Sequence, residues 1–277
     1  MKSTIPVFIL GSGRSGTFQM VKLLEAAGSV EAHHEYLFES TLKPAVLHRM
    51  GAISKEGVKS LLATMHKAAV HYSKAAYWVD SSNALPWIVE PLYEIFPEAR
   101  FIHLLRDGRK VVSSFYNKFT EVMYDDRNVE IVNAWLAAPI RTIEPPAEKK
   151  YWRPFPMLGE PFAAEFPGFD RFQRLCYYWQ DCNLHIRRSL EHIPAAQQTT
   201  LYLEDVVSQQ SALERFLSIF DLNYDQRYMD MLQRPVNVHI PKNFPFTETQ
   251  YAKFEAIAGD AMRAFGYHER NEYEVEY

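Results

Sequence analysis

The chain has 277 residues, of which 47% are apolar and 14% aromatic, and its 30 basic and 34 acidic residues give a formal net charge of −4. This length supports a sizeable core in one large domain or two small ones, and the aromatic content excludes a disordered chain. The weakly acidic balance argues against a protein that binds nucleic acid through phosphate contacts. No run reaches the roughly 18 apolar residues of a membrane span, so we expect no membrane partner.

Apolar, strand-like runs alternate with helical patterns along the chain. Strands are predicted at 5–10, 76–80, 100–106 and 199–203. Helices are predicted from about residue 16, within 36–75, at 85–96 and 108–119, from the last strand through 221, and at 247–267. Nearly continuous apolar strands are typical of parallel strands that are buried on both faces.

The alternation of strands and helices indicates the fold class. Successive strand–helix–strand units form right-handed crossovers, which place helices on both faces of a parallel sheet. We therefore predict an α/β protein with a P-loop-NTPase-like central parallel sheet, and we interpret residues 1–277 as one domain.

Residues 121–168 break the alternation and show no clear period. They hold seven of the sixteen prolines together with a group of aromatic residues. A long irregular insert in a compact domain is usually functional or mobile. Two interpretations are open, a surface excursion with its own aromatic cluster or a lid over an acceptor pocket.

The loop at 11–17, Gly-Ser-Gly-Arg-Ser-Gly-Thr, lies directly between the first strand and the first helix. Glycines let the backbone approach an anion, and the N–H groups of the loop and of the helix N-terminus point toward it. Gly11 and Gly16 have the spacing of a nucleotide-binding loop, but the lysine that a Walker loop needs after Gly16 is absent. Arg14 supplies the cation instead, so we predict a phosphate loop without a Walker lysine.

A second motif covers residues 96–114, where an apolar strand ends in Arg106 and a helix follows at once. Ligands of α/β proteins bind at the carboxyl ends of parallel strands. Arg106 and Ser114, two turns into the helix, can converge on one anionic group, and Lys118 lies one turn further on the same helix face. The motif therefore predicts a second phosphate site.

Together these motifs resemble those of the sulfotransferases that use 3′-phosphoadenosine 5′-phosphosulfate (PAPS). The loop is similar to the family's 5′-phosphosulfate loop, P-R-S-G-T. Residues 96–114 are similar to its 3′-phosphate motif, F-P-x-A-K-F-I-x-L-x-R-D-x-R-x-V-x-x-S, and retain the spacing of eight between Arg106 and Ser114. Residues 201–206 resemble the family's Y-E-D-L, although Leu203 stands where the family has tyrosine.

The resemblance implies which residues bind the donor and which catalyse. The donor-binding set is Gly13, Arg14, Ser15, Gly16, Thr17, Phe18, Arg106, Ser114, Lys118 and Lys242. In the bacterial and tyrosylprotein branch the base is a glutamate eighteen residues beyond the threonine of the loop, which corresponds to Glu35. Asp80, at the end of a predicted strand, is the alternative base. The catalytic lysine of the tyrosylprotein branch is absent where Ser81 or Ser82 stands, which leaves its role to Arg14, the loop amides or these serines.

The implied activity is transfer of a sulfo group from PAPS to a hydroxyl or amine of a small-molecule acceptor, with adenosine 3′,5′-bisphosphate (PAP) as product. A P-loop small-molecule kinase that uses ATP and Mg²⁺ is the alternative. We expect no metal, because a sulfuryl group carries less charge than a phosphoryl group and His33 and His34 lack further ligands at suitable spacing.

The expected compartment is the cytoplasm. The two cysteines, Cys176 and Cys182, lie in one predicted helix and exclude a disulfide framework. We interpret both as core residues. The membrane anchor that Golgi members of the family carry at the N-terminus is also absent from the sequence.

Overall fold

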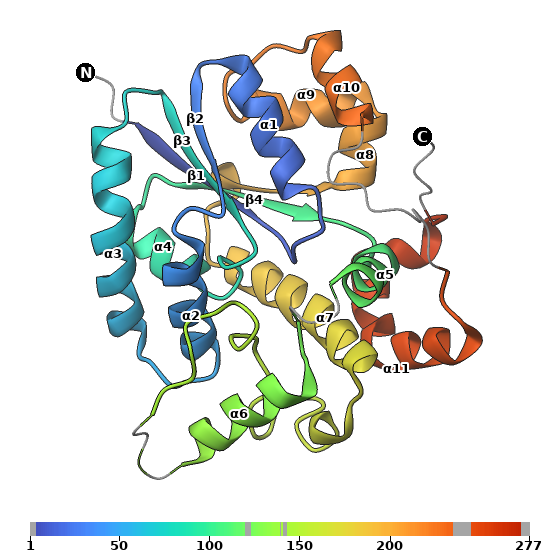
Figure 1. Cartoon of the computed structure of the whole chain (residues 1–277). Coiled ribbons are helices and arrows are strands. Elements are labelled where there is room, and N and C mark those ends of the chain that lie inside the picture. Colours follow the sequence, from blue (N-terminus) through green and yellow to red (C-terminus); the bar gives the residue numbers. More distant parts are fainter. Residues whose placement is uncertain (1–3, 120–122, 139, 141–142, 235–244, 273–277) are drawn as a thin grey trace.

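A parallel sheet forms the central layer of the protein (Figure 1). The computed structural model describes residues 4–119, 123–138, 140, 143–234 and 245–272. Within them, five strands lie in the order β2-β3-β1-β4-β5, and all four pairings are parallel. The strands are β1 (Ile5–Leu10), β2 (Val30–His34), β3 (Tyr77–Ser82), β4 (Arg100–Leu105) and β5 (Gln198–Tyr202). The predicted α/β class is confirmed.

Helices cover both faces of the sheet. Alternate strand residues point to opposite sides, so each face presents apolar side chains to the helices packed on it. Val7 and Ile9 of β1 pack into one apolar cluster, and Phe8 and Leu10 pack into the other. The first cluster includes residues of α1 (Thr17–Ala27), α8 (Leu203–Ser208), α9 (Gln210–Ser218) and α10 (Gln226–Gln233). The second includes residues of α2 (Phe38–Arg49), α3 (Lys55–Tyr72), α4 (Val89–Ile95), α5 (Gly108–Lys118), α7 (Arg171–Leu190) and α11 (Glu248–Ala264).

The long helices begin at side-chain caps that the sequence supplies. Asp170 and Gln173 form a capping box at the start of α7, and Thr247 and Gln250 form another at the start of α11. Cys176 and Cys182 are free and buried within α7, as predicted. Among the described residues, no helix is both long and apolar enough to cross a bilayer.

The segment 121–168 differs from the prediction in one respect, because part of it is helical. Helix α6 (Asp126–Ala137) begins where the Asp125 side chain accepts a hydrogen bond from the backbone N–H of Asn128 at 3.3 Å. Val129 and Val132 are its buried apolar positions. Apart from the 3₁₀ turn η1 (Phe166–Gly168), the other described residues of the segment form turns and irregular structure. The apolar stripe of α6 is short, and the proline-rich and aromatic sequence that follows it shows no helical period, so the sequence did not predict this helix.

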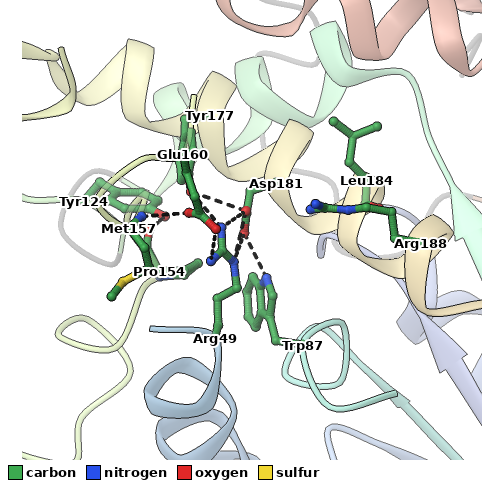
Figure 2. A network of polar contacts seen from close by, with 10 residues as sticks. All are labelled: Arg49, Trp87, Tyr124, Pro154, Met157, Glu160, Tyr177, Asp181, Leu184 and Arg188. Atoms are coloured by element: carbon green, nitrogen blue, oxygen red, sulfur yellow. Dashed lines mark hydrogen bonds and ion pairs between the residues drawn. The ribbon is translucent and has the colours of Figure 1, made fainter. Parts of the chain in front are cut away.

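A partly buried ion-pair network connects this insert with α2 and α7 (Figure 2). Arg49 at the end of α2 donates two hydrogen bonds to Glu160 of the insert, at 3.0 and 2.9 Å. The same guanidinium lies 2.6 Å from Asp181 of α7, which also accepts a hydrogen bond from the indole N–H of Trp87. Burial alone would lower the pKa of Arg49, but the charge of Asp181 and its hydrogen bonds with Asp181 and Glu160 raise that pKa overall. The insert is therefore anchored by a charge that is fully paired.

Candidate active site

The candidate site lies where the central strands of the sheet end. Because β3 and β4 flank β1 on opposite sides, the carboxyl ends of these three strands meet at a topological switch point. The loop 11–17 follows β1, Asn83 follows β3, and Arg106 follows β4. The fold thus brings the two sequence motifs to the same edge of the sheet.

The backbone of the loop has the conformation that its glycines permit. Gly13, Arg14 and Gly16 have φ angles of 72°, 54° and 84°. A side chain at Gly16 would also place its Cβ 2.4 Å from the Cδ1 atom of Leu203. Leu203 departs from the family tyrosine at the third motif, and here it packs directly against the loop. The tight turn then leads into α1, which begins at Thr17.

Three cations from the two motifs gather at this loop. Arg106 Nη1 donates to the backbone carbonyl of Arg14 at 2.5 Å, and Arg14 Nε donates to Ser114 Oγ at 3.1 Å. Burial and then the charge of Arg106 lower the pKa of Arg14, and burial and the charges of both arginines lower the pKa of Lys118. None of the three makes an ion pair with a described residue. Cations crowded without a carboxylate form a site for an anion.

Glu204 of the third motif binds the backbone of Asp107 in the second motif. The Glu204 carboxylate accepts a hydrogen bond from the backbone N–H of Asp107 at 2.9 Å and another from the Tyr267 hydroxyl at 3.0 Å. Burial raises the pKa of Glu204 despite these bonds. Asp107 in turn caps α5 through the backbone N–H of Arg109 at 2.8 Å. Asp107 therefore pairs with Arg109, and Arg106 is left to face the loop.

Glu35 lies directly after β2 and points toward the end of β3. Its backbone has a left-handed φ of 56°, and its N–H donates to the carbonyl of Ser81 at 3.0 Å. The carboxylate accepts a hydrogen bond from Asn83 Nδ2 at 2.6 Å, and its other oxygen lies 4.0 Å from Lys149 Nζ. A Cβ at Gly13 would lie 3.2 Å from the same Asn83 amide nitrogen. Asn83 therefore connects Glu35 with the loop.

Lys149 comes from the insert and faces the candidate base. Its Nζ also lies 4.6 Å from the centroid of the Phe38 ring. Burial lowers its pKa, and the charges of Arg153 and Arg14 lower it further, whereas Glu35 acts in the opposite direction. Lys149 thus brings a cation to Glu35 from a distant part of the chain. Nothing in the sequence marks Lys149, whereas Asn83 was open to prediction because it follows a strand at the switch point.

Asp80 lies inside β3 and is fully buried. One carboxylate oxygen accepts a hydrogen bond from the backbone N–H of Tyr36 at 3.1 Å, and the other lies 3.7 Å from His66 Nε2. Its described contacts hold the backbone next to Glu35. On the same strand, the Ser81 hydroxyl donates to the carbonyl of Thr17 at 3.2 Å and so ties β3 to the loop.

The remaining predicted residues are placed as follows. The ring of Phe18 lies 5.2 Å from that of His34, at the end of β2. The Ser15 hydroxyl is buried and has no hydrogen-bond partner in the described structure. Lys242 lies outside the described residues. Within the described ranges, no group of three or more His, Cys, Asp or Glu side chains is arranged to hold a metal ion.

Comparisons with known proteins place this site in a family. The sequence profile of the sulfotransferase family matches residues 6–144, which include the loop, Glu35, Arg106 and Ser114. The chain belongs to the sulfotransferase family. The comparison with curated protein sequences returns no match. Nothing in these comparisons supports the kinase alternative.

Two solved structures similar to this chain are sulfotransferase domains. The sulfotransferase domain of the Synechococcus PCC 7002 olefin synthase is 13% identical, with a TM-score of 0.50 and coverage of 99% of this chain and 98% of that one. The sulfotransferase domain from the curacin biosynthetic pathway is 15% identical, with a TM-score of 0.49 and coverage of 100% and 95%. At these identities the likeness concerns the fold alone.

Proposed function

We propose that the protein transfers a sulfo group from PAPS to a hydroxyl or amine of a small-molecule acceptor and releases PAP. The observation that carries this proposal is the direct contact between the two motifs, in which Arg106 binds the Arg14 carbonyl and Arg14 binds Ser114. A donor with phosphates at both the 5′ and the 3′ position needs two adjacent anion sites. In this proposal the loop holds the 5′-phosphosulfate, and Arg106, Ser114 and Lys118 hold the 3′-phosphate.

Glu35 acts as the general base in this mechanism. The acceptor oxygen or nitrogen attacks sulfur in line, the bond between sulfur and the 5′-phosphate oxygen breaks, and the acceptor proton passes to the Glu35 carboxylate. Asn83 orients that carboxylate through the hydrogen bond of 2.6 Å. Positioning of the reacting groups, together with stabilisation of charge, is how a protein accelerates such a transfer.

Arg14 and Lys149 stabilise the charge that moves during the reaction. Negative charge develops on the leaving phosphate, next to Arg14 and the loop amides. Lys149 approaches from the insert, and its charge acts on both Glu35 and Arg14. We assign to Lys149 the stabilising role that the family lysine has in the tyrosylprotein branch. Asp80, which binds the Tyr36 backbone, positions the segment after β2 and is not the base.

The proposed acceptor is a small molecule, and the proposed compartment is the cytoplasm. Two buried free cysteines are suited to a reducing compartment. A small-molecule acceptor is what membership of the sulfotransferase family implies.

Two measurements test the donor and the reaction. Calorimetry should detect binding of PAP in the presence of EDTA, and binding of ATP should be much weaker with or without Mg²⁺. Incubation with PAPS and candidate acceptors should then give products heavier by one sulfo group, again in EDTA. Loss of activity in EDTA with rescue by Mg²⁺, together with a preference for ATP, would overturn the proposal in favour of a kinase.

A further inference from the structure

Arg153 is a buried cation without a partner in the part of the chain that the structure describes. The residue is 2% exposed, and its Nε and Nη1 atoms are buried and make no hydrogen bond. Its guanidinium carbon lies 5.9 Å from the centroid of the Tyr178 ring. The Tyr178 hydroxyl is likewise buried and without a partner. Two side chains, one from the insert and one from α7, thus present unused hydrogen-bond donors in the same place.

The carboxylates in this neighbourhood are already engaged. Glu35, Asp181 and Arg153 all act electrostatically on Tyr178. Glu35 is bound by Asn83 and faced by Lys149. Asp181 is bound by Arg49 and the Trp87 indole (Figure 2). Arg153 is therefore left with no carboxylate of its own.

Such an arrangement is costly unless a ligand completes it. An unpaired charge in a protein interior loses its hydration, and arginine does not escape this cost by losing its proton. Burial raises the pKa of Tyr178, so its hydroxyl keeps its proton and remains a donor. A neutral ligand would satisfy hydrogen bonds but leave the charge unpaired, whereas an oxyanion would satisfy both.

We infer that Arg153, Tyr178 and Lys149 form an anion subsite that binds a carboxylate or a phosphate or sulfate ester carried by the acceptor. The inference rests on the proposed function only in calling this ligand the acceptor. Arg153 offers the planar, two-pronged geometry that oxyanions match. Solvent reaches the cluster at Lys149, whose side chain is 35% exposed. The charge of Arg153 acts on Lys149, which faces Glu35, so the acceptor's anion would lie near the base that activates its hydroxyl or amine.

Binding of small probes to the PAP-saturated protein tests this subsite, because PAP occupies both phosphate sites of the donor and leaves open only the position of its sulfo group, which the Arg153 variant tells apart from the subsite. Benzoate and phenyl phosphate should each bind at least tenfold more tightly than benzamide, which has the shape of benzoate without its charge. The preference should disappear in Arg153→Met and persist in Arg188→Met, a matched control that removes an exposed charge from α7. Whichever of the two anions binds more tightly identifies the class of oxyanion.

Thermal unfolding without any ligand separates a binding role from a structural one. Arg153→Met should unfold at the same temperature as the wild type or at a higher one, because it removes an unpaired buried charge. A lower unfolding temperature together with an unchanged preference for benzoate would mean that Arg153 is a structural residue, and the inference would be wrong. It would also be wrong if the wild type does not distinguish benzoate or phenyl phosphate from benzamide.

Two further readouts complete the test. If Arg153→Met does not fold, Arg153→Lys replaces it, and this variant should keep part of the preference because it keeps the charge. PAP affinity is measured in parallel. If the wild type binds PAP but does not prefer the anionic probes, the subsite alone is overturned. If the wild type does not bind PAP, the proposed function is overturned.

Discussion

The two halves of the candidate site are assembled from the chain in different ways. The half that we propose for the donor, called the donor half, contains Arg14, Arg106, Ser114 and Lys118, which all follow strands β1 and β4 within a few turns. The half that we propose for the acceptor, called the acceptor half, includes Lys149 and Arg153, which reach the site from an insert whose described residues form no strand. Arg14 and Ser114 are joined directly by a hydrogen bond of 3.1 Å, whereas Lys149 lies 4.0 Å from Glu35. The difference separates the part of the site that lies at the strand ends from the part that the irregular insert supplies.

The two halves of the site should tolerate amino-acid changes differently. An anion site at strand ends depends on backbone geometry, so its residues keep a fixed spacing. An insert can approach that site from outside, held here by buried aromatic residues such as Trp152 and by the contact of Arg49 with Glu160. Changes in the insert should therefore alter the handling of the acceptor and leave the donor in place.

Glu35 stands at the junction of the two halves, and its substitution should have the largest effect. We expect Glu35→Gln to lower kcat by about 10²- to 10⁴-fold, because a general base contributes that much. Glutamine keeps the shape of the side chain and can still accept the Asn83 hydrogen bond, so PAP affinity should hardly change. Steady-state kinetics with PAPS and an acceptor that the wild type sulfates, and calorimetry with PAP, measure both quantities.

Asp80→Asn is the matched variant, because the Asp80 carboxylate contacts the Tyr36 backbone. We expect a smaller loss of kcat than in Glu35→Gln. If Asp80→Asn loses more kcat than Glu35→Gln, Asp80 is the base and Glu35 is the positioning residue. If neither variant loses tenfold, the acceptor needs no protein base.

The donor half should respond to a single change with weaker PAP binding. Arg106→Ala removes a charge-assisted hydrogen bond, which costs about 1.5–3 kcal/mol, or roughly a tenfold to hundredfold loss of affinity. Arg109→Ala is the control, because Asp107 already binds that guanidinium. Calorimetry should show a much weaker effect for Arg109→Ala, and equal affinity in wild type and Arg106→Ala would contradict the 3′-phosphate assignment.

The anchor of the insert should affect the acceptor half alone. Glu160→Gln weakens the contact with Arg49, while Asp181 still pairs with that arginine. Because the Glu160 side chain is 36% exposed, we expect a loss of only about 1 kcal/mol in the free energy of unfolding. The KM for the acceptor should rise severalfold, and the Kd for PAP should stay the same. An equal change in both constants would show that the halves are not independent.

The sequence predicted the donor half more completely than the acceptor half for a physical reason. Glycine positions, strand ends and helix starts leave local signals, so the loop, Arg106 and Ser114 were found from spacing and context. Glu35 was found through the resemblance to a family branch. The parallel sheet followed from strands such as β1 and β4, which are apolar on both faces.

Lys149 and Arg153 left no comparable signal. Their position depends on a long-range anchor between Arg49 and Glu160, which are 111 residues apart in the chain. Helix α6 was missed because its apolar stripe is short. Pairings of this kind arise from tertiary packing and have no local period that a sequence can display.

The last prediction concerns the pH dependence of Lys149 and should be the smallest effect. Burial and the charges of Arg153 and Arg14 lower its pKa, so Lys149 loses its proton at a lower pH than an ordinary lysine. If its positive charge stabilises the transition state, kcat/KM should fall as the pH rises through this lowered pKa. Lys149→Arg should move that alkaline limb to higher pH, because arginine remains charged throughout this range.

At neutral pH the same variant should differ from the wild type by only a few fold, since both side chains are cationic there. Lys150→Arg is the matched control from the adjacent position. A hydrogen bond with Glu148 raises the pKa of Lys150, so the control should leave the alkaline limb where it is. If the limb stays in place in Lys149→Arg as well, another group titrates there, and the insert contributes no catalytic charge to the site.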